Sequence, residues 1–576
     1  MGRGVWGQRD GQRRLGGIAL CGIGLMTCIA GSGLAIDGTA AAPAEGSSVD
    51  SDNLAPAPVP IELTQLSPVQ GPPSLLQPAP SQAVGAAPTA SSILAQQNVT
   101  QGGEVPSREW TIVPSVTVGE TYNDNVNLAP KGQAQADFIT TVQPGLLISA
   151  TGPRLNLSLN YNPFINYYAR GTTASPQILQ NLIGTGRIQL VPEWFSVDAG
   201  ASINQQTVNN TGAIVTTNLT NSSNSQTVQS YHISPDLKHQ FGDLLISDTN
   251  YSFGSTIVGG DLIAPTVTHS LSETVSNGPA FGNLSWSAKA SSSRTNSESG
   301  TGTTDPLAGT SSKDDLAEAD LGYALGFIGL PGLSAIGTFG YEDLTDPSLF
   351  GDLSGLYWNG GFQYQPNQIL SLKFTYGRRY NQPNYAFSGK YDTGQTQITA
   401  SYAETVQTIS SLAQNSLGAL IPGPNGTVID PLTGQQIPES QINLFGLQST
   451  TFLDKLGTVT AQTTRGRNTY SITASDEIRK TDVPPQNEEV VSGFASWRRQ
   501  LWPDLSSSLG ASYSHINFGD GTGRVDQLYT INLGLTYTVS PNATASLNVS
   551  RSDQISTSAT ENITTDLVAF LFSQKF

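Results

Sequence analysis

Hydrophobic and polar residues alternate along most of the chain from Trp110 to the C-terminus. In VDQLYTINLGLTYTV (525–539), apolar or aromatic residues fall on one side of a two-residue period and polar residues fall on the other. The same alternation recurs in LNLSLNY at 155–161 and in LSLKFTY at 370–376. A period of two predicts β-strands that have one apolar face and one polar face.

The breaks between these predicted strands differ in length in a regular way. Tight turns such as QPNQ (365–368) and SPNA (540–543) alternate with long loops rich in Asn, Ser and Thr, and one irregular segment falls at about 410–441. Counting predicts about 20 to 22 strands, and an even number if the series starts and ends on the same side. The strands expected at 390–405 and 450–464 would nevertheless run in the same direction. Either a further strand lies near LFGLQST (444–450), or one of the shorter strands is misassigned.

Two architectures accommodate many alternating strands. A soluble sandwich or propeller buries the apolar faces, whereas a transmembrane barrel turns them to lipid and the polar faces to the lumen. The strands are long, their polar faces carry Asn, Thr, Ser and some charges, and Trp or Tyr residues recur near strand ends, as at Trp110, Tyr167 and Trp502. We therefore expect an all-β fold, a transmembrane antiparallel up-and-down β-barrel over 109–576, with an irregular insertion at about 410–441.

The first 35 residues predict an export signal. Arginines precede the apolar run LGGIALCGIGLMTCIAG, and Gly33-Leu34-Ala35 offers a small-x-small cleavage site. The alternatives are a membrane anchor, for which the glycine-rich run is barely long enough, and a lipoprotein modified at Cys28. We expect a signal peptide over 1–35, removed on export to a Gram-negative outer membrane. A disordered periplasmic linker over 36–108, rich in Pro, Ala, Ser and Gln, is expected to follow.

Composition narrows the classes of function. The formal charge is −17, so we expect no nucleic-acid partner. Cys21 and Cys28 are the only cysteines, and both precede the expected cleavage site. The four histidines fall on separate predicted strands, a spacing that suggests no metal site. Asp314, Asp315, Glu318 and Asp320 come from one strand without a partnered cleft, so we expect a solvated acidic rim. The expectation is no catalytic residue, no metal, no cofactor and no enzymatic activity.

Charged residues on the polar phase of the strands are the best candidates for a functional role. Lys289, Glu318, Asp320 and Lys373 are predicted to line the lumen, where charge biases which solutes pass. The alternative is that these residues pair with one another across a filled lumen.

The opening of the barrel region resembles a known family. The stretch WTIVPSVTVGETYNDNVNLAP, the Pro144-Gly145 start of the second strand and the Arg467-Asn468 turn are similar to the putative beta-barrel porin 2 family, which includes outer-membrane proteins associated with PEP-CTERM and exopolysaccharide loci. The resemblance covers about 108–576. It implies an outer-membrane porin-like barrel, with polysaccharide or its export apparatus as a partner.

The last strand resembles the C-terminal assembly signal of bacterial outer-membrane proteins. Val568, Phe570, Phe572 and Phe576 match its alternating apolar residues and terminal aromatic, and Gln574 departs from it. The resemblance implies the β-barrel assembly machinery and periplasmic chaperones as partners, and the outer-membrane bilayer as the destination.

Two functions follow from these expectations. The first is a conduit that gives passive passage to hydrophilic solutes or an exported polysaccharide. The second is a structural or surface-docking barrel that acts through its extracellular loops without a conducting pore. A transporter energised from the inner membrane would need a folded plug domain, for which residues 36–108 are too low in sequence complexity.

Overall fold

The protein is described by a computed structural model that covers residues 109–576 with short gaps. The gaps are residues 172–175, 209–212, 216, 218, 221, 223, 261–262, 300–304, 350–352, 409–420, 423–426, 431–434, 439–446, 448–449, 483–484 and 520. The expected signal peptide (1–35) and linker (36–108) lie outside the described residues, as does most of the expected insertion at 410–441. No helix in the described part of the chain is both long and apolar enough to cross a membrane.

Nearly all described elements are strands. The first half of the large sheet comprises β1 (Glu109–Asn123), β2 (Asp137–Thr151), β3 (Leu155–Tyr161), β4 (Phe164–Tyr168), β5 (Gln177–Leu179), β6 (Leu182–Val191), β7 (Phe195–Thr207), β8 (Ser225–Phe241), β9 (Leu245–Val258), β10 (Thr266–Asn277), β11 (Leu284–Ser297) and β12 (Ser311–Ala324). The second half comprises β13 (Leu333–Thr345), β14 (Gly355–Tyr364), β15 (Leu370–Arg379), β16 (Gln382–Asp392), β17 (Thr396–Gln407), β21 (Phe452–Arg465), β22 (Asn468–Asp482), β23 (Pro485–Trp502), β24 (Leu505–Asn517), β25 (Val525–Ser540), β26 (Ala543–Ser556) and β27 (Ile563–Lys575). Outside it are a small sheet of β18 (Ile421–Pro422), β19 (Thr427–Asp430) and β20 (Gln435–Pro438), and the 3-10 helices η2 (Pro279–Phe281), η3 (Gly326–Ile328) and η6 (Ala559–Glu561).

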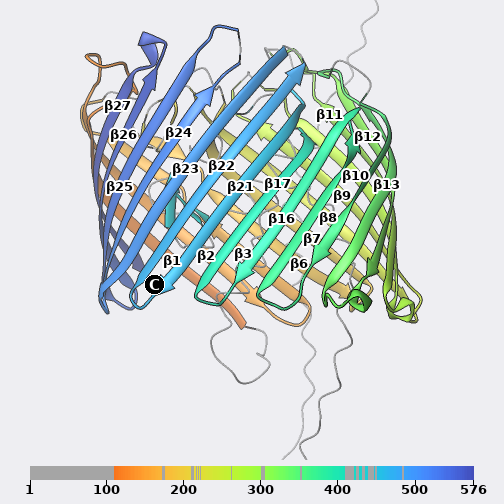
Figure 1. Ribbon diagram of the computed structural model, residues 1–576. Coiled ribbons are helices and arrows are strands. Elements are labelled where there is room, and N and C mark those ends of the chain that lie inside the picture. The colour runs from red at the N-terminus through yellow and green to blue at the C-terminus, as the bar shows by residue number, and fades with distance from the viewer. Residues whose placement is uncertain are drawn as a thin grey trace, which may run out of the picture. The chain divides into compact units, whose positions relative to one another are not determined.

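The large sheet closes on itself (Figure 1). Its strands pair antiparallel with their neighbours in sequence, and β1 pairs with β27 from Ser115 opposite Lys575 to Asn123 opposite Leu567. We call each position in the closed ring of strands a stave. β3 and β4 both pair with β2 and share one stave, and β5 and β6, which pair with β4 and β3, share the next. The 24 strands therefore make 22 staves. The prediction of an antiparallel up-and-down barrel is confirmed.

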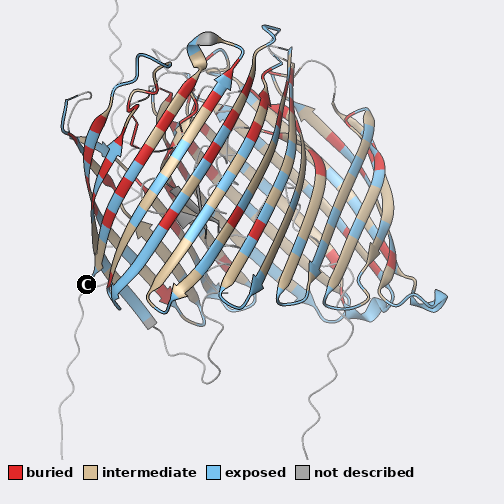
Figure 2. Ribbon diagram, turned by 60° about the vertical axis from the view of Figure 1, so that its left-hand side comes forward, coloured by how far each residue is buried: buried red, intermediate tan, exposed pale blue. Residues whose placement is uncertain are grey.

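The two faces of the sheet differ as the alternation predicts. Along β25, Tyr529, Ile531 and Leu533 are exposed, whereas Asp526 and Thr530 between them are buried. Figure 2 shows this alternation of exposed and covered residues along the strands. We call the face that carries the exposed apolar side chains the outward face, and the opposite face the inward face.

The connections divide into a short-turn end and a long-loop end. β1 begins and β27 ends at the short-turn end, and the C-terminus lies at this lower end of the barrel in Figure 1. The strand expected at 390–405 is wrong in its bounds, because β16 ends at Asp392 and β17 starts at Thr396. A two-residue turn at Tyr380 and Asn381, both with positive φ, joins β15 to β16 at the long-loop end. That turn supplies the missing reversal of direction. Leu447 and Thr450, the described residues of the LFGLQST stretch, lie outside any strand.

Gly361 and Gly493 are a matched pair of mid-strand glycines that test how closely the wall is packed. A Cβ at Gly361 would overlap the carbonyl oxygen of Phe374 on the neighbouring strand, whereas a Cβ at Gly493 would meet no atom within 4 Å. We expect Gly361→Ala to destabilise the barrel by about 1–3 kcal/mol, as overpacking commonly does. Gly493→Ala is expected to have a much smaller effect.

Urea titration of both variants, scored by the heat-modifiable migration of the folded barrel on gels, checks this prediction. Equal unfolding midpoints for the two alanine variants would contradict the steric argument.

Candidate functional site

The inward face of the wall brings together three of the four residues predicted to line the lumen. Lys289 and Glu318 are direct cross-strand neighbours of β11 and β12, with 3.6 Å between the Lys289 Nζ and a Glu318 carboxylate oxygen. The Tyr357 hydroxyl also donates to Glu318 at 2.5 Å. Asp320 accepts hydrogen bonds from Ser287 (3.0 Å) and Thr338 (2.5 Å). These charges are engaged by neighbours on the wall.

Lys373 is the exception. It lies on the inward face of β15, its side chain is exposed, and no carboxylate of the described residues lies within ion-pair distance of its ammonium. An exposed cation on a lumen wall acts on passing ions far more than a paired one does. A role of Lys373, Lys289, Glu318 and Asp320 in selecting solutes stays a prediction.

A second ion pair on this wall was not predicted from the sequence. Arg379 donates through Nε and Nη2 to both carboxylate oxygens of Glu342, at 2.8 and 3.0 Å, and its guanidinium lies 4.8 Å from the ring centre of Tyr357. Arg379 continues the two-residue phase of Lys373, so the alternation could have indicated its face. Its partner could not be identified without the register of β13, β14 and β15.

The loop between β7 and β8 folds into the mouth of the barrel at the long-loop end. Its described residue Ile214 packs in an apolar cluster with Val490, Ile516, Phe518 and Leu528 of the distant strands β23–β25 and the loop after β24. Leu219 packs in another cluster on the inward face of β27 and β2, which includes Ala569, Ile139 and Val126 of the β1–β2 loop. The loop therefore covers the inner wall far from the two strands that it connects.

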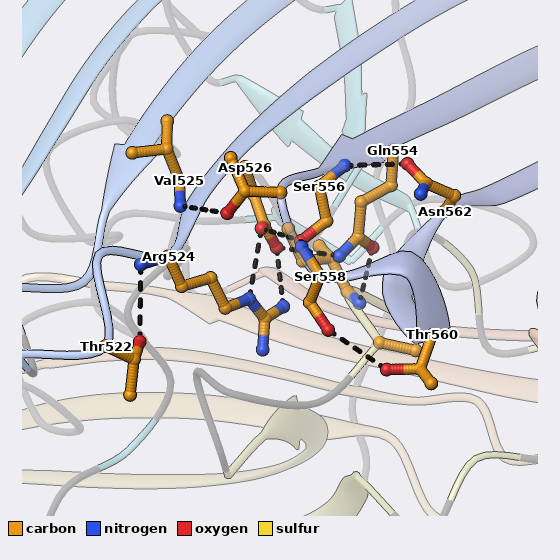
Figure 3. A network of polar contacts seen from close by, with 12 residues as sticks. Thr522, Arg524, Val525, Asp526, Gln554, Ser556, Ser558, Thr560 and Asn562 are labelled. Carbon is orange, nitrogen blue, oxygen red and sulfur yellow. Dashed lines mark hydrogen bonds and ion pairs between the residues drawn. The ribbon is translucent and has the colours of Figure 1, made fainter.

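Polar contacts fix the position of this loop. The Ile214 N–H donates to the Gln554 side-chain oxygen (3.2 Å), and the Gln554 amide donates to Asp526 (2.9 Å). Arg524 also binds Asp526, with its Nε and Nη2 at 3.0 and 2.6 Å from the two carboxylate oxygens. Figure 3 shows Arg524, Gln554 and Ser556 converging on Asp526, which has no exposed surface. At the other apolar cluster, the Asn123 amide donates to the Leu219 carbonyl at 3.2 Å.

An acidic group in a nearby turn has a shifted pKa. Burial raises the pKa of Glu561 in η6, the charge of Arg524 opposes this, and the charge of Asp526 adds to it. The Arg524–Asp526 pair thus acts on the ionisation of its surroundings as well as on the loop.

The loop between β17 and β21 enters the mouth from the other side. Its described residue Leu447 packs with Val208, Val228, Val258 and Ile263, and its N–H donates to the Thr207 carbonyl at 3.1 Å. About half of the ring of staves separates β17 and β21 from β7–β9 in either direction, so this loop reaches the opposite wall. Near its end, Thr451 bonds Asp346 (2.6 Å) and Ser348 (2.9 Å) in the β13–β14 loop.

These features define a class of protein. A closed barrel with an apolar outward face and a polar inward face is an outer-membrane β-barrel. The model of the family described as Putative beta-barrel porin 2 matches residues 457–572, which run from within β21 into β27. The predicted resemblance to that family is thereby confirmed over these residues. Its extension over about 108–456 and the association with PEP-CTERM and exopolysaccharide loci stay predictions.

Solved structures of outer-membrane barrels resemble the chain at low identity. The FrpB iron transporter from Neisseria meningitidis is 10% identical, with coverage of 85% of this chain and 84% of that chain and a TM-score of 0.47. The siderophore receptor PirA from Pseudomonas aeruginosa is 12% identical, with 82% and 81% coverage and a TM-score of 0.41. A loop-deletion mutant of OmpT, an outer membrane protein of Vibrio cholerae, is 8% identical, with 82% and 100% coverage and a TM-score of 0.30. No curated protein matches the sequence. At these identities the similarity concerns the barrel fold alone.

The Asp526 contacts give a testable account of how the β7–β8 loop is held. Asp526→Ala removes the acceptor that orients Gln554 and the carboxylate that binds Arg524, and breaking a buried pair in this way costs about 3–5 kcal/mol. We expect the loop to detach, so that Ala213→Cys is labelled by a hydrophilic maleimide several-fold faster in the Asp526→Ala background.

Asp553→Ala is the matched control, because its pair with Arg551 is partly exposed and is worth about 0–1 kcal/mol. Gln554→Met, which removes the acceptor of the Ile214 N–H and one donor to Asp526 but keeps the Arg524–Asp526 pair, should accelerate labelling if Asp526→Ala fails to fold. Unchanged labelling in Gln554→Met would contradict the account.

Proposed function

We propose that the protein is an outer-membrane conduit that gives passive passage to hydrophilic solutes or an exported polysaccharide, and that it is not an enzyme. The observation that carries the proposal is the polar inward face of a closed barrel of 22 staves. Barrels of this size enclose a lumen wide enough to conduct or to hold a plug. Here, two of the chain's own loops enter the mouth.

The proposal includes an orientation. The short-turn end faces the periplasm and the long-loop end faces outward, as is general for such barrels. The expected linker at 36–108 then lies in the periplasm, where it would meet the export apparatus. In this orientation, the inward-folded loops narrow the outer mouth.

The lumen wall favours weak, neutral contact over tight binding. Hydroxyl and amide groups occur along the inward faces, as at Ser475 and Ser492 or Thr460 and Thr473, which bond one another across adjacent strands. Many inward charges are paired on the wall. A hydrophilic solute would exchange hydrogen bonds with such a surface without meeting a strong field, which suits passage.

The alternative is a docking barrel whose two inward-folded loops close the lumen. Nothing enters the lumen in that case, and the outer surface of the loops carries the function. Single-channel recording in planar bilayers separates the two proposals, because a folded barrel without conductance would exclude the conduit.

Within the conduit proposal, Lys373 is expected to favour anions. Lys373→Glu replaces the exposed inward cation by an anion, so the reversal potential across a KCl gradient should move toward cation selectivity. Arg378→Glu is the matched control, since Arg378 lies an odd number of residues from Lys373 along β15 and is therefore on the outward face of the same strand. Identical shifts of the reversal potential in both variants would contradict a role of Lys373 in ion selectivity.

The C-terminal residues Val568, Phe570, Phe572 and Phe576 are proposed to direct assembly. All four are exposed, and the Phe576 N–H also donates to the Pro114 carbonyl at 2.9 Å. We expect deletion of Phe576 to reduce the amount of folded barrel in the outer membrane. Phe576→Ala, which keeps the backbone bond and removes the ring, should reproduce most of that loss.

The measurement is the fraction of heat-modifiable protein in isolated outer membranes. Gln574→Ala is the control, because Gln574 does not match the assembly signal. Normal insertion of Phe576→Ala with impaired insertion of the deletion would assign the effect to barrel closure and would contradict a signal in the ring.

A further inference from the structure

Two neighbouring turns at the short-turn end together carry several exposed apolar side chains. In the β12–β13 turn, Phe327 is 75% exposed, Ile328 53% and Leu330 47%. In the adjacent β10–β11 turn, Phe281 is also exposed. The Ala324 N–H donates to the Asn283 carbonyl at 3.0 Å and ties the two turns side by side. We call Phe281, Phe327, Ile328 and Leu330 the apolar ledge.

The backbone of the larger turn is built to present these side chains. Gly329 and Gly332 have φ values of 85° and 79°, which are accessible to glycine at little cost. A Cβ at Gly332 would also overlap the backbone of Gln365 in the next turn, so the chain passes close to its neighbour there. The turn can thus fold back tightly while η3 displays Phe327 and Ile328.

The apolar ledge is continuous with the lipid-facing surface of the barrel. Tyr323 lies on the outward face of β12 beside Leu321, and its ring contacts Phe327 edge-on with 6.4 Å between centroids. Trp286 lies on the outward face of β11 and makes the corresponding contact with Phe281 at 5.9 Å. Through these ring contacts, the apolar outward surface continues beyond the strand ends onto the two turns.

These turns combine exposed apolar side chains with an absence of charge, which several other turns at the same end do not share. Residues 278–283 and 325–332 contain no charged side chain, whereas Arg154, Glu193, Arg467 and Asp504 occupy other short turns. Asp243, in the adjoining β8–β9 turn, marks one edge of the apolar ledge. Neutral, aromatic surface is typical of residues placed at the boundary between headgroups and acyl chains.

We propose that the apolar ledge inserts into the inner leaflet of the outer membrane and anchors the barrel there on one side. The occupant that we infer is lipid, because the ledge extends an existing lipid-facing surface and lacks the charges that would confer specificity on a protein contact. A consequence is that β10–β13 sit deeper toward the periplasm than the opposite wall.

Site-specific fluorescence tests this proposal. Phe327→Cys and Ile328→Cys are made singly in a chain with Cys21→Ser and Cys28→Ser, labelled with an environment-sensitive fluorophore and placed in phosphatidylcholine nanodiscs. Gln395→Cys is the matched control, because Gln395 is exposed in the β16–β17 turn at the same end. Heat-modifiable migration verifies that each labelled variant is folded.

We expect the labels at 327 and 328 to emit at shorter wavelength than the label at 395. Brominated phosphatidylcholine should quench them several-fold more than it quenches the control, and aqueous iodide should quench them less. Strong iodide quenching at 327 and 328 without an effect of brominated lipid would overturn the proposal, and it would leave the ledge free for a soluble protein.

Discussion

In the interior of a bilayer, a backbone N–H or C=O without a partner has no water to bond, and the cost of leaving it unpaired is high. Every stave of this barrel meets that constraint only because β1 and β27 pair along nine residues of each strand. That pairing joins the start of the barrel to the end of the chain. It also requires an even number of staves, because both ends must meet at the short-turn end. The strand count and the position of the C-terminus are consequences of the same hydrogen bonds.

Closure of the barrel creates an inward face with two different environments, and each of them favours different side chains. Where the wall faces open lumen, alternation places Ser, Thr, Asn and occasional charges inward. Near the long-loop end, some inward positions are apolar, as at Leu528, Ile139 and Ala569. These residues have no lipid and no core of their own to face. They are buried because Ile214 and Leu219 of the β7–β8 loop cover them.

This explains what the sequence could and could not predict. The period of two identified the strands, the barrel and the side of each strand on which Lys289, Glu318, Asp320 and Lys373 fall. It gave no account of Leu528, because the reason for an apolar residue on the polar phase is clear only when the covering loop is known. It likewise explained only the outward face of β27, although Leu567, Ala569 and Leu571 make the inward face apolar as well.

The other features that the sequence did not predict also depend on contacts between residues far apart in the chain. The turn at Tyr380 and Asn381 lacks glycine and proline, and Asn381 is its one residue that commonly forms turns, so the local signal is weak. Both residues adopt the positive φ that a type I′ hairpin turn requires. The pairing of Arg379 with Glu342 depends on the register of three strands. Alternation reports the face of a residue and carries no information about its partner. Strand bounds and ion pairs therefore needed the structure.

Apolar and polar contacts contribute in different ways to the position of the two loops in the lumen. Apolar burial is non-directional, so the clusters around Ile214 and Leu447 could hold the loops against the wall in several positions. Hydrogen bonds from Gln554 and Asn123 to the loop backbone select one of them, and Asp526 selects the orientation of Gln554. Because Arg524 neutralises Asp526 at a site without solvent exposure, this orientation does not depend on ions in the lumen. The described parts of the two loops are thus held in the mouth at positions that the wall itself sets.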